Sequence, residues 1–172
     1  IGISKILLLT GKRKKTKEIL IKLVSKYDKS YMGHKMLAEI YEQEGGMRKS
    51  IDEYVKVLDI KRNDYKSYYR ISILLRDLGR NKEAIQMLDN LLKVKPEHCL
   101  ASEMLAELLI EAEDYKKAIK VINKALKIHE DKVELIYNLG IAYVKTNEFS
   151  LAKKCFEKVV SLNNQHYNAY YR

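Results

Sequence analysis

The sequence predicts an all-α fold built from one repeated helix pair, and three features carry this prediction. A pattern of apolar and small residues returns every 34 residues along the chain. Within each unit the apolar residues recur at the spacing of amphipathic helices, without the sustained alternation typical of strands. Proline occurs once, at Pro96, so almost nothing in the sequence interrupts helices.

The unit over residues 133–166 shows the pattern most clearly. Leu139, Gly140 and Tyr143 share one face of a first helix, and Ala152 and Phe156 share one face of a second helix. We expect the small residues among these bulky ones to mark places where two helices cross closely.

The other units follow in order with the same columns. An incomplete unit covers residues 1–30, full units cover 31–64, 65–98, 99–132 and 133–166, and residues 167–172 begin another. The first-helix column is Leu37, Ile71, Leu105 and Leu139; the second-helix columns are Ser50, Ala84, Ala118 and Ala152, and Tyr54, Leu88, Ile122 and Phe156. Because each pair has more apolar surface than it can cover alone, neighbouring pairs must stack.

The turn between the two helices has a column of its own. Gly11, Gly45 and Gly79 occupy it, at a point where a residue free to adopt positive φ ends a helix. The next two units depart from this pattern with Glu113 and Asn147.

These columns resemble the tetratricopeptide repeat over essentially the whole chain, and Pro96 fits the proline that this family places between repeats. The resemblance implies a right-handed α-α superhelix (solenoid) of about five helix-turn-helix repeats, incomplete at both ends, in a single domain over residues 1–172. It also implies a non-catalytic scaffold that binds a peptide or partner protein in the concave groove formed by the first helices.

Nothing in the sequence predicts an enzyme, a cofactor or a metal site. The histidines occupy scattered repeat positions, so we expect them on the surface, and no phosphate-binding loop, metalloprotease motif or nucleophile signature occurs. Cys99 and Cys155 form no C-x-x-C pair, which favours a reduced, cytoplasmic compartment, and we interpret Cys155 as a packing residue.

The longest aliphatic run, residues 6–9, is far too short to span a bilayer, and we interpret it as part of a buried helix. The chain begins without methionine, which indicates a fragment. A membrane anchor before residue 1, which would place the chain at the cytoplasmic face of a membrane, stays open as an alternative.

The candidate binding residues are those that repeat packing leaves free on the first helices. In the resembled family such positions line the groove, and here they combine apolar, aromatic and charged side chains. The predicted peptide-binding groove comprises Lys35, Lys66, Tyr69, Arg70, Ile73, Leu100, Glu103, Glu107, Glu111, Tyr137, Asn138, Ile141 and Lys145. The alternative is that superhelical curvature buries some of its apolar members against neighbouring first helices.

Three glutamates spaced by four residues, from Glu103 to Glu111, predict an acidic ridge along one first helix. With apolar residues on either side, the ridge favours a peptide that carries Lys or Arg between apolar residues. The alternative is that Arg70, Arg76 and Lys145 neutralise the ridge across helices, in exposed ion pairs that contribute about 0–1 kcal/mol each.

The resembled family has a subclass that clamps the C-terminal carboxylate of a chaperone, and most of that clamp is missing here. Lys66 and Arg70 match its last basic pair, but Met36 stands where an asparagine is needed. We therefore predict no chaperone carboxylate as the partner.

The net charge of +10 is concentrated at one end, because residues 1–30 hold nine Lys and Arg against two acidic residues. A rival hypothesis is that the basic turn from Lys12 to Lys17 binds an anionic surface, either nucleic acid or a membrane. No aromatic residue interleaves this run to stack bases, which disfavours nucleic acid and favours a solvated turn.

Residues 167–172 begin a helix whose partner helix is missing from the sequence. We expect either disorder there or self-association through Tyr167, Tyr170 and Tyr171.

Overall fold

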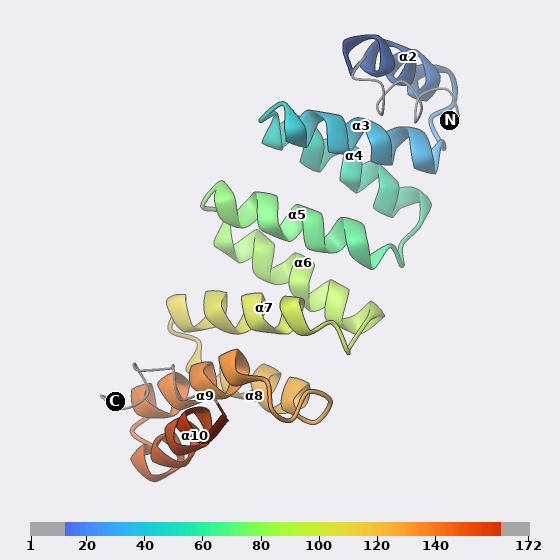
Figure 1. Ribbon diagram of the computed structural model, residues 1–172. Helices are drawn as coiled ribbons and strands as arrows, with labels where there is room; N and C mark the ends of the chain where they lie inside the picture. Colours follow the sequence, from blue (N-terminus) through green and yellow to red (C-terminus); the bar gives the residue numbers. More distant parts are fainter. Residues whose placement is uncertain (1–12, 163–172) are drawn as a thin grey trace. The chain divides into compact units, whose positions relative to one another are not determined.

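A computed structural model describes residues 13–162, and this part of the chain contains nine α-helices and no strand (Figure 1). The predicted all-α helical repeat fold is confirmed. The chain divides into two compact units, which we call unit 1 (up to Ala84) and unit 2 (from Ile85), and each is described by itself. The expectations for residues 1–12 and for the tyrosines of 167–172 lie outside the described residues.

Unit 1 consists of α2 (Arg13–Lys26), α3 (Tyr31–Gln43), α4 (Met47–Ile60), α5 (Tyr65–Asp77) and the first turn of α6 (Asn81–Val94). Each of the four complete helices packs on the next, α2 on α3, α3 on α4 and α4 on α5. Helices α3 and α5 are first helices of the repeated pair, and α2 and α4 are second helices.

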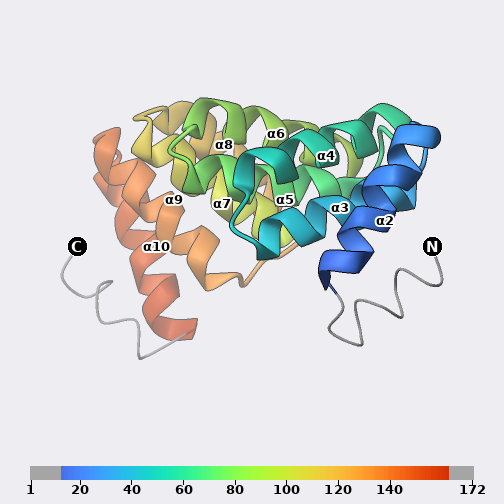
Figure 2. The same ribbon diagram turned by 90° about the horizontal axis from the view of Figure 1, so that it is seen from above.

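Unit 2 consists of the remainder of α6 and of α7 (Cys99–Glu111), α8 (Tyr115–Leu126), α9 (Val133–Lys145) and α10 (Phe149–Leu162). Helix α7 packs on α8, α8 on α9, and α9 on α10, which lie alongside each other in Figure 2. The two first helices of this unit, α7 and α9, also contact each other directly.

The predicted core columns are buried in both units. In the first helices, Leu37, Ile71, Leu105 and Leu139 are at most 6% exposed. In the second helices, the large column of Tyr54, Leu88, Ile122 and Phe156 is at most 4% exposed, and the small column is buried as well. Burying each large aliphatic or aromatic side chain contributes about 1.5–3 kcal/mol, so these columns hold the helix pairs together.

Glycine 140 lies where the prediction placed a close helix crossing, in α9 against α10. A Cβ atom at Gly140 would lie 2.6 Å from Cε1 of Phe156, which is closer than carbon atoms approach without strain. In unit 1, Gly33 has the corresponding role, because a Cβ there would lie 2.9 Å from Cγ1 of Val24 in α2. A larger residue would therefore force a neighbouring side chain to move at either crossing.

The turn column takes positive φ in every repeat that is described. Gly45 and Gly79 have φ of 75° and 72°, and Glu113 and Asn147 have φ of 59° and 62°. The two repeats that lack glycine at this position therefore keep the same left-handed turn. Their residues have a Cβ atom, so this conformation has an energetic cost for them.

The expectation that the histidines lie on the surface is wrong for His34, which is 3% exposed. Its Nδ1 lies 2.6 Å from Oε2 of Glu53, and its Nε2 lies 2.7 Å from the carbonyl oxygen of Asp28. A polar ring can be buried in this way because both of its nitrogen atoms have hydrogen-bond partners.

Histidine 98 is half-buried and caps a helix. Its Nδ1 accepts a hydrogen bond from the backbone N–H of Ala101 in the first turn of α7, at 3.2 Å. Burial lowers the pKa of His98, which favours the neutral ring that can accept this bond.

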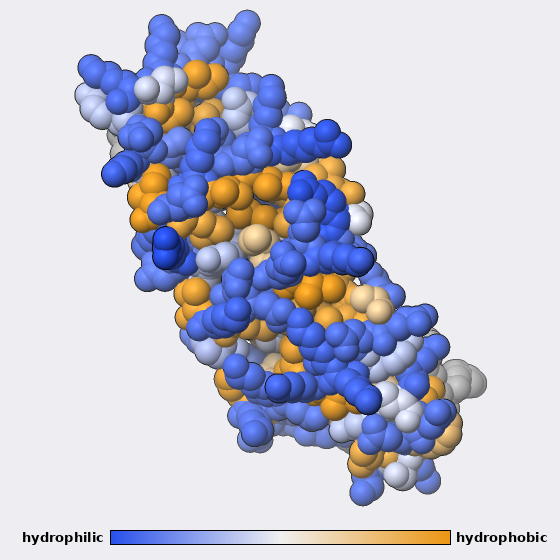
Figure 3. All heavy atoms as spheres, turned by 180° about the vertical axis from the view of Figure 1, so that it is seen from behind, coloured by the Kyte–Doolittle hydropathy of each residue, from blue (hydrophilic) through white to orange (hydrophobic). Residues whose placement is uncertain are grey.

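Apolar side chains also reach the surface. Ile60, Val94 and Leu162, the last residues of three second helices, are 36%, 40% and 40% exposed, and Ile128, two residues after α8, is 48% exposed. Seen from behind, apolar patches interrupt the hydrophilic surface (Figure 3). Within residues 13–162, none of the helices combines the length and apolar character that a membrane span requires.

Candidate functional site

The first-helix face of unit 1, which we define as the outward side of α3 and α5, carries five of the predicted groove residues. Lys66 and Arg70 are exposed, whereas Lys35, Tyr69 and Ile73 are partly buried. Two ion pairs join the helices of this face, one at Asp64 and the other at Glu42.

Asp64 is the centre of a polar cluster between α3 and α5, and it is 6% exposed. Its Oδ2 accepts hydrogen bonds from the hydroxyl of Tyr31 at 2.6 Å and from Nζ of Lys35 at 2.9 Å. Its Oδ1 caps α5 through the backbone N–H of Lys66 at 3.2 Å. Burial raises the pKa of Asp64, but the hydrogen bonds from Tyr31 and Lys35 outweigh this effect and leave that pKa below its ordinary value.

Arg70 is the second cation of this face with a fixed partner. Its Nε donates to Oε2 of Glu42 at 3.2 Å, and its Nη2 also pairs with the same carboxylate. Arg76 pairs with Asp77 of its own helix at 3.1 Å. The ion pairs described for both arginines therefore lie within unit 1. The pair with Glu42 connects Arg70 of α5 to α3.

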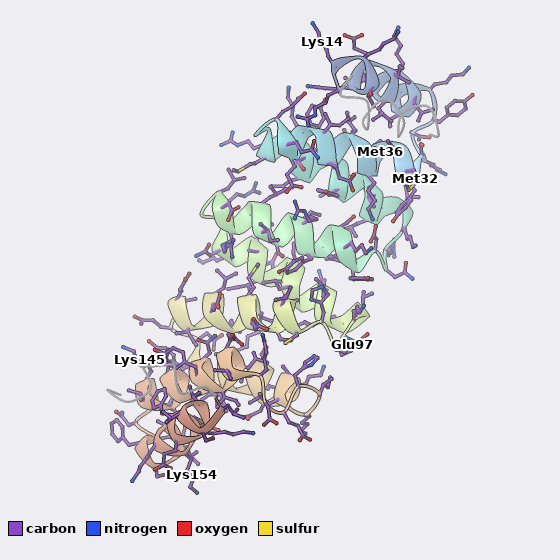
Figure 4. The ribbon with its side chains drawn as sticks, in the orientation of Figure 1. Lys14, Met32, Met36, Glu97, Lys145 and Lys154 are labelled. Atoms are coloured by element: carbon purple, nitrogen blue, oxygen red, sulfur yellow. The ribbon has the colours of Figure 1, made fainter. Side chains whose placement is uncertain are left out.

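The first-helix face of unit 2, the outward side of α7 and α9, is less polar. Leu100 is 54% exposed on α7, and Tyr137 and Ile141 are half-buried on α9. Because α7 and α9 contact each other, these apolar residues lie on adjacent helices. Lys145 is exposed near the end of α9, where Figure 4 labels it.

The predicted acidic ridge lies along α7 of this face. Glu107 and Glu111 are exposed, and Glu103 is half-buried. Oε1 of Glu103 lies 3.5 Å from Nζ of Lys132, the residue that precedes α9. The same oxygen accepts a hydrogen bond from Sγ of Cys99 at 3.0 Å.

The two cysteines are poor nucleophiles. Burial raises the pKa of Cys99 to about 11, and the hydrogen bond to Glu103 adds to this effect. Burial also raises the pKa of Cys155. Both thiols therefore stay protonated at neutral pH, and the interpretation of Cys155 as a packing residue fits its place beside the core cluster that contains Phe156.

The apolar members of this face rest on the core. The ring centroids of Tyr137 and Phe156 lie 5.8 Å apart in a tilted arrangement. Ile141 packs against the core cluster that contains Phe156. Each keeps part of its side chain exposed. Fixed on one side and open on the other, such residues offer contact area at low entropic cost.

The sixth position of the repeat is buried in three of the four full repeats, with Arg70 as the exposed exception, and this corrects the expectation that Asn138 is left free by repeat packing. Asn138 is 9% exposed, and Met36, labelled on α3 in Figure 4, and Met104 are 5% and 7% exposed. The reason is helical spacing, since the third, sixth, seventh and tenth positions form one buried stripe. In α9 that stripe is Leu135, Asn138, Leu139 and Ala142.

Sequence reasoning missed the anions that hold Lys35 and Arg70 in place. Asp64 could have been found, because an aspartate directly before a helical pattern predicts an N-cap. Glu42 lies 28 residues from Arg70, and no local pattern joins them.

A basic surface covers the start of α2 in unit 1, where Figure 4 shows Lys14 pointing away from the helix. Arg48 and Lys49, which open α4, join Lys17 around a cavity of about 460 Å³. Tyr41 also lines this cavity, and its ring centre lies 4.9 Å from Nζ of Lys17 and 5.7 Å from Nζ of Lys49. An aromatic ring does therefore lie among these cations, although none lies within the run from Lys12 to Lys17.

The described part of the chain contains no cluster of side chains suited to bind a metal ion. Among residues 13–162, no group of three or more His, Cys, Asp and Glu side chains is placed to hold an ion.

Two sequence profiles described as tetratricopeptide repeat match the chain, one over residues 69–132 and the other over residues 109–172. No match is found among curated proteins.

Several solved structures share the fold. YrrB, described as a TPR protein with an unusual peptide-binding site, is 14% identical, with a TM-score of 0.82 over 99% of this chain and 88% of its own. MamA from Desulfovibrio magneticus RS-1 is 19% identical, with a TM-score of 0.73 over 96% and 94% of the two chains. A tetratricopeptide repeat protein from Parabacteroides merdae is 20% identical, with a TM-score of 0.78 over 99% and 68%.

At such identities the structures show likeness of fold alone, whereas the two profiles together cover residues 69–172 with the repeat itself. The predicted helix pairs, the buried columns and the profile matches agree, and the chain belongs to the tetratricopeptide repeat family.

Proposed function

We propose that the first-helix face of unit 2 binds a peptide, or a segment of a partner protein, that carries Lys or Arg between apolar residues. Tetratricopeptide repeat proteins are scaffolds for protein–protein interaction and are generally non-catalytic. The observation that carries the proposal is that α7, which bears the acidic ridge, contacts α9, which bears the partly exposed Tyr137 and Ile141.

Electrostatics supports a cationic ligand. Like charges four residues apart destabilise a helix by about 0.2–0.5 kcal/mol per pair, and α7 contains two such pairs between Glu103 and Glu111. A ligand ammonium or guanidinium group beside Glu107 and Glu111, which are exposed, relieves this repulsion.

Apolar surface supports flanking apolar residues in the ligand. Leu100 stands on α7 with more than half of its surface exposed, and Tyr137 and Ile141 stand on α9. YrrB is described as having a peptide-binding site, which supports a peptide as the class of ligand. In unit 1, the exposed Lys66 and the half-buried Tyr69 and Ile73 remain candidate contact residues.

The test uses a fluorescein-labelled peptide, Gly-Leu-Arg-Leu-Gly, and its glutamine analogue Gly-Leu-Gln-Leu-Gly. We expect the arginine peptide to bind the full chain more tightly, and Glu107→Lys to weaken its binding by about tenfold or more, which is about 1.4 kcal/mol. Glu157→Lys, the same charge change on an exposed residue of α10, is the matched control. Equal binding of the arginine peptide by Glu107→Lys and Glu157→Lys would contradict the proposal.

A second candidate function is the binding of a polyanion by the basic surface of unit 1. The grouping of Lys17, Arg48 and Lys49 around the half-buried Tyr41 favours it, because cations together with an aromatic ring suit a nucleic acid strand. A thymidine oligonucleotide and vesicles with anionic lipid distinguish the two kinds of surface. Polyanion binding falls steeply between 50 and 200 mM salt, about 10³–10⁵-fold where 6–10 phosphates are contacted, and is lost in Arg48→Glu.

A further inference from the structure

We propose that a cavity of about 680 Å³ in unit 1 binds an acidic peptide segment, in which a carboxylate side chain lies next to an aliphatic one. The cavity lies between the C-terminal halves of α2 and α4, with the turn after α2 and the start of α3 beside it. It belongs to the second helices, so the inference does not depend on the first-helix face of unit 2.

The walls of the cavity are apolar and its rim is charged. Val24 of α2 and Ile60 of α4 supply the aliphatic surface, and Ile60 is 36% exposed. Lys29 in the turn and Lys56 on α4 are the cations of the rim. On the face seen from behind, apolar patches show between hydrophilic side chains over unit 1 (Figure 3).

His34 also lines the cavity and is 3% exposed. Glu53 and the carbonyl oxygen of Asp28 occupy both ring nitrogens. The ring has no hydrogen-bonding capacity left, so a ligand meets fixed polar surface there and finds its ionic partners on the rim.

The equivalent place in unit 2, three repeats further along the chain, is bridged by an ion pair. Lys158 of α10 stands 102 residues after Lys56, and Asp131 stands 102 residues after Lys29. Nζ of Lys158 lies 3.0 Å from Oδ1 of Asp131 and donates to the carbonyl oxygen of Glu130 at 3.0 Å. The lysine of the second helix thus crosses to the turn and binds both its carboxylate and its backbone.

In unit 1, neither of the two groups that bind this lysine in unit 2 is available to Lys56. The turn offers Lys29 in place of the aspartate, and the carbonyl oxygen of Asp28 is taken by His34. Lys56 instead binds Glu53 of its own helix at 2.8 Å. In the described part of unit 1, no ion pair joins the turn after α2 to α4, and the cavity stays open.

The comparison identifies the chemistry of the occupant. A ligand carboxylate between Lys29 and Lys56 supplies the anion that Asp131 supplies in unit 2. An aliphatic neighbour on the ligand covers Val24 and Ile60, as burial of apolar surface favours.

Two acidic residues narrow the choice of ligand. Asp28 and Asp59 also line the cavity, so a chain of closely spaced phosphates meets repulsion there. A single carboxylate carries less charge and meets less of this repulsion. The acidic peptide is therefore favoured over a nucleic acid or a membrane surface.

A smaller cavity two repeats further along shows that this place recurs. It measures about 180 Å³ and is lined by Leu92, Pro96, Ser102 and Lys124, which stand 68 residues after Val24, Asp28, His34 and Lys56. The ion pair of Lys117 with Asp89, at 2.6 Å, joins the two second helices beside it. Of the two cavities, the one in unit 1 is the larger.

The experiment uses the full chain and three labelled peptides, Gly-Val-Glu-Val-Gly and its glutamine and lysine analogues. We expect the glutamate peptide to bind at least about tenfold more tightly than either analogue, a difference of about 1.4 kcal/mol. NMR chemical-shift changes should centre on the methyl groups of Ile60 and Val24. Shift changes centred on Ile141 instead would overturn the assignment of the site.

The decisive variant is Lys29→Asp, which places in unit 1 the aspartate that pairs with Lys158 at the equivalent place in unit 2. We expect the new carboxylate to bind Lys56. The variant should then bind the glutamate peptide at least about tenfold more weakly. Arg62→Asp makes the same charge change in the turn after α4, at a residue that does not line the cavity, and should bind as the unmodified chain does. Lys29→Gln should give an intermediate loss and replaces Lys29→Asp if circular dichroism shows that the latter is poorly folded. Unchanged affinity in either Lys29 variant, or no preference for glutamate over glutamine in the peptide, overturns the proposal.

Discussion

In unit 1, the first helices α3 and α5 are joined by the ion pairs of Lys35 with Asp64 and of Arg70 with Glu42. In unit 2, the first helices α7 and α9 contact each other beside apolar side chains, and Lys132 before α9 reaches Glu103. The same repeat columns are buried beneath both faces. Repeat packing therefore dictates the core of each unit and leaves the chemistry of its faces to individual residues.

Charge separates the two units further. Residues 13–84 of unit 1 contain 18 Lys and Arg against 11 acidic residues, a net charge of +7, whereas residues 85–162 of unit 2 contain 12 of each. Both of our proposals that involve unit 1 concern anionic ligands, and the proposal for unit 2 concerns a cationic one. The difference shows how one repeat can present ligand surfaces of opposite sign.

The largest effect is expected from Leu105→Ala in the core of unit 2. Leu105 is completely buried between the helices of its repeat, so the variant should lose about 2–5 kcal/mol of stability. Hydrogen exchange should show the loss in residues 85–162 more than in unit 1, because repeats interact mainly with their neighbours. Leu100→Ala, which removes an exposed leucine of the same helix, should change stability by less than about 0.5 kcal/mol. Uniform loss of protection in both units would show that they unfold as one.

The next effect tests the polar cluster around Asp64 in unit 1. The pKa of Asp64 is lowered on folding, so its contribution to stability is present above its ordinary value of 3.8 and is lost as pH falls through the lower folded pKa. Asp64→Asn should cost about 1.5–3 kcal/mol at neutral pH and should remove this part of the acid dependence.

Urea denaturation between pH 2 and pH 7 measures the effect of Asp64. Asp52→Asn, at an exposed residue of α4, is the matched control and should keep the acid dependence of the unmodified chain. If Asp64→Asn and the unmodified chain lose stability in parallel below pH 4, the cluster does not stabilise unit 1 through the charge of Asp64.

A third prediction compares the two helix crossings. Gly140→Ala places a Cβ atom 2.6 Å from the ring of Phe156, and a buried ring has little room to move, so we expect a loss of about 1–3 kcal/mol. Gly33→Ala in unit 1 meets Oγ of Ser30 at 2.8 Å and a methyl group of Val24, which can rotate, and should cost less. Thermal unfolding of both variants gives the order, and a more damaging Gly33→Ala would reverse our reading of the crossings.

The smallest expected effect is a gain. Glu113 holds φ of 59° where unit 1 has glycine, so Glu113→Gly should stabilise unit 2 by about 0.5–1 kcal/mol. Asn147→Gly should gain less, because asparagine tolerates this conformation better than glutamate does. A chemical denaturation series can resolve the difference, and destabilisation by Glu113→Gly would show that its side chain has a structural role.

The sequence by itself determined the repeated helix pairs, the core columns and the left-handed turns. Helical packing recurs at a fixed spacing, so each buried position appears four times over, as in the column of Leu37 and Leu105. The same register located the positive φ of Gly45 and Gly79, whereas the structure showed that Glu113 and Asn147, where the glycine pattern breaks off, adopt it too. The register also contained the buried stripe that covers Asn138, once the third, sixth, seventh and tenth positions are read together.

Only the tertiary structure decided which charged side chains meet. Tyr31 and Asp64 are 33 residues apart, Arg70 and Glu42 are 28 apart, and the acceptors around His34 come from a turn and from another helix. These pairs follow no period, because they depend on the approach of two helices and on the rotamers of long side chains at each crossing. The open cavity beside Lys29 has the same origin, since a single change of charge in a turn leaves Lys56 with a partner in its own helix.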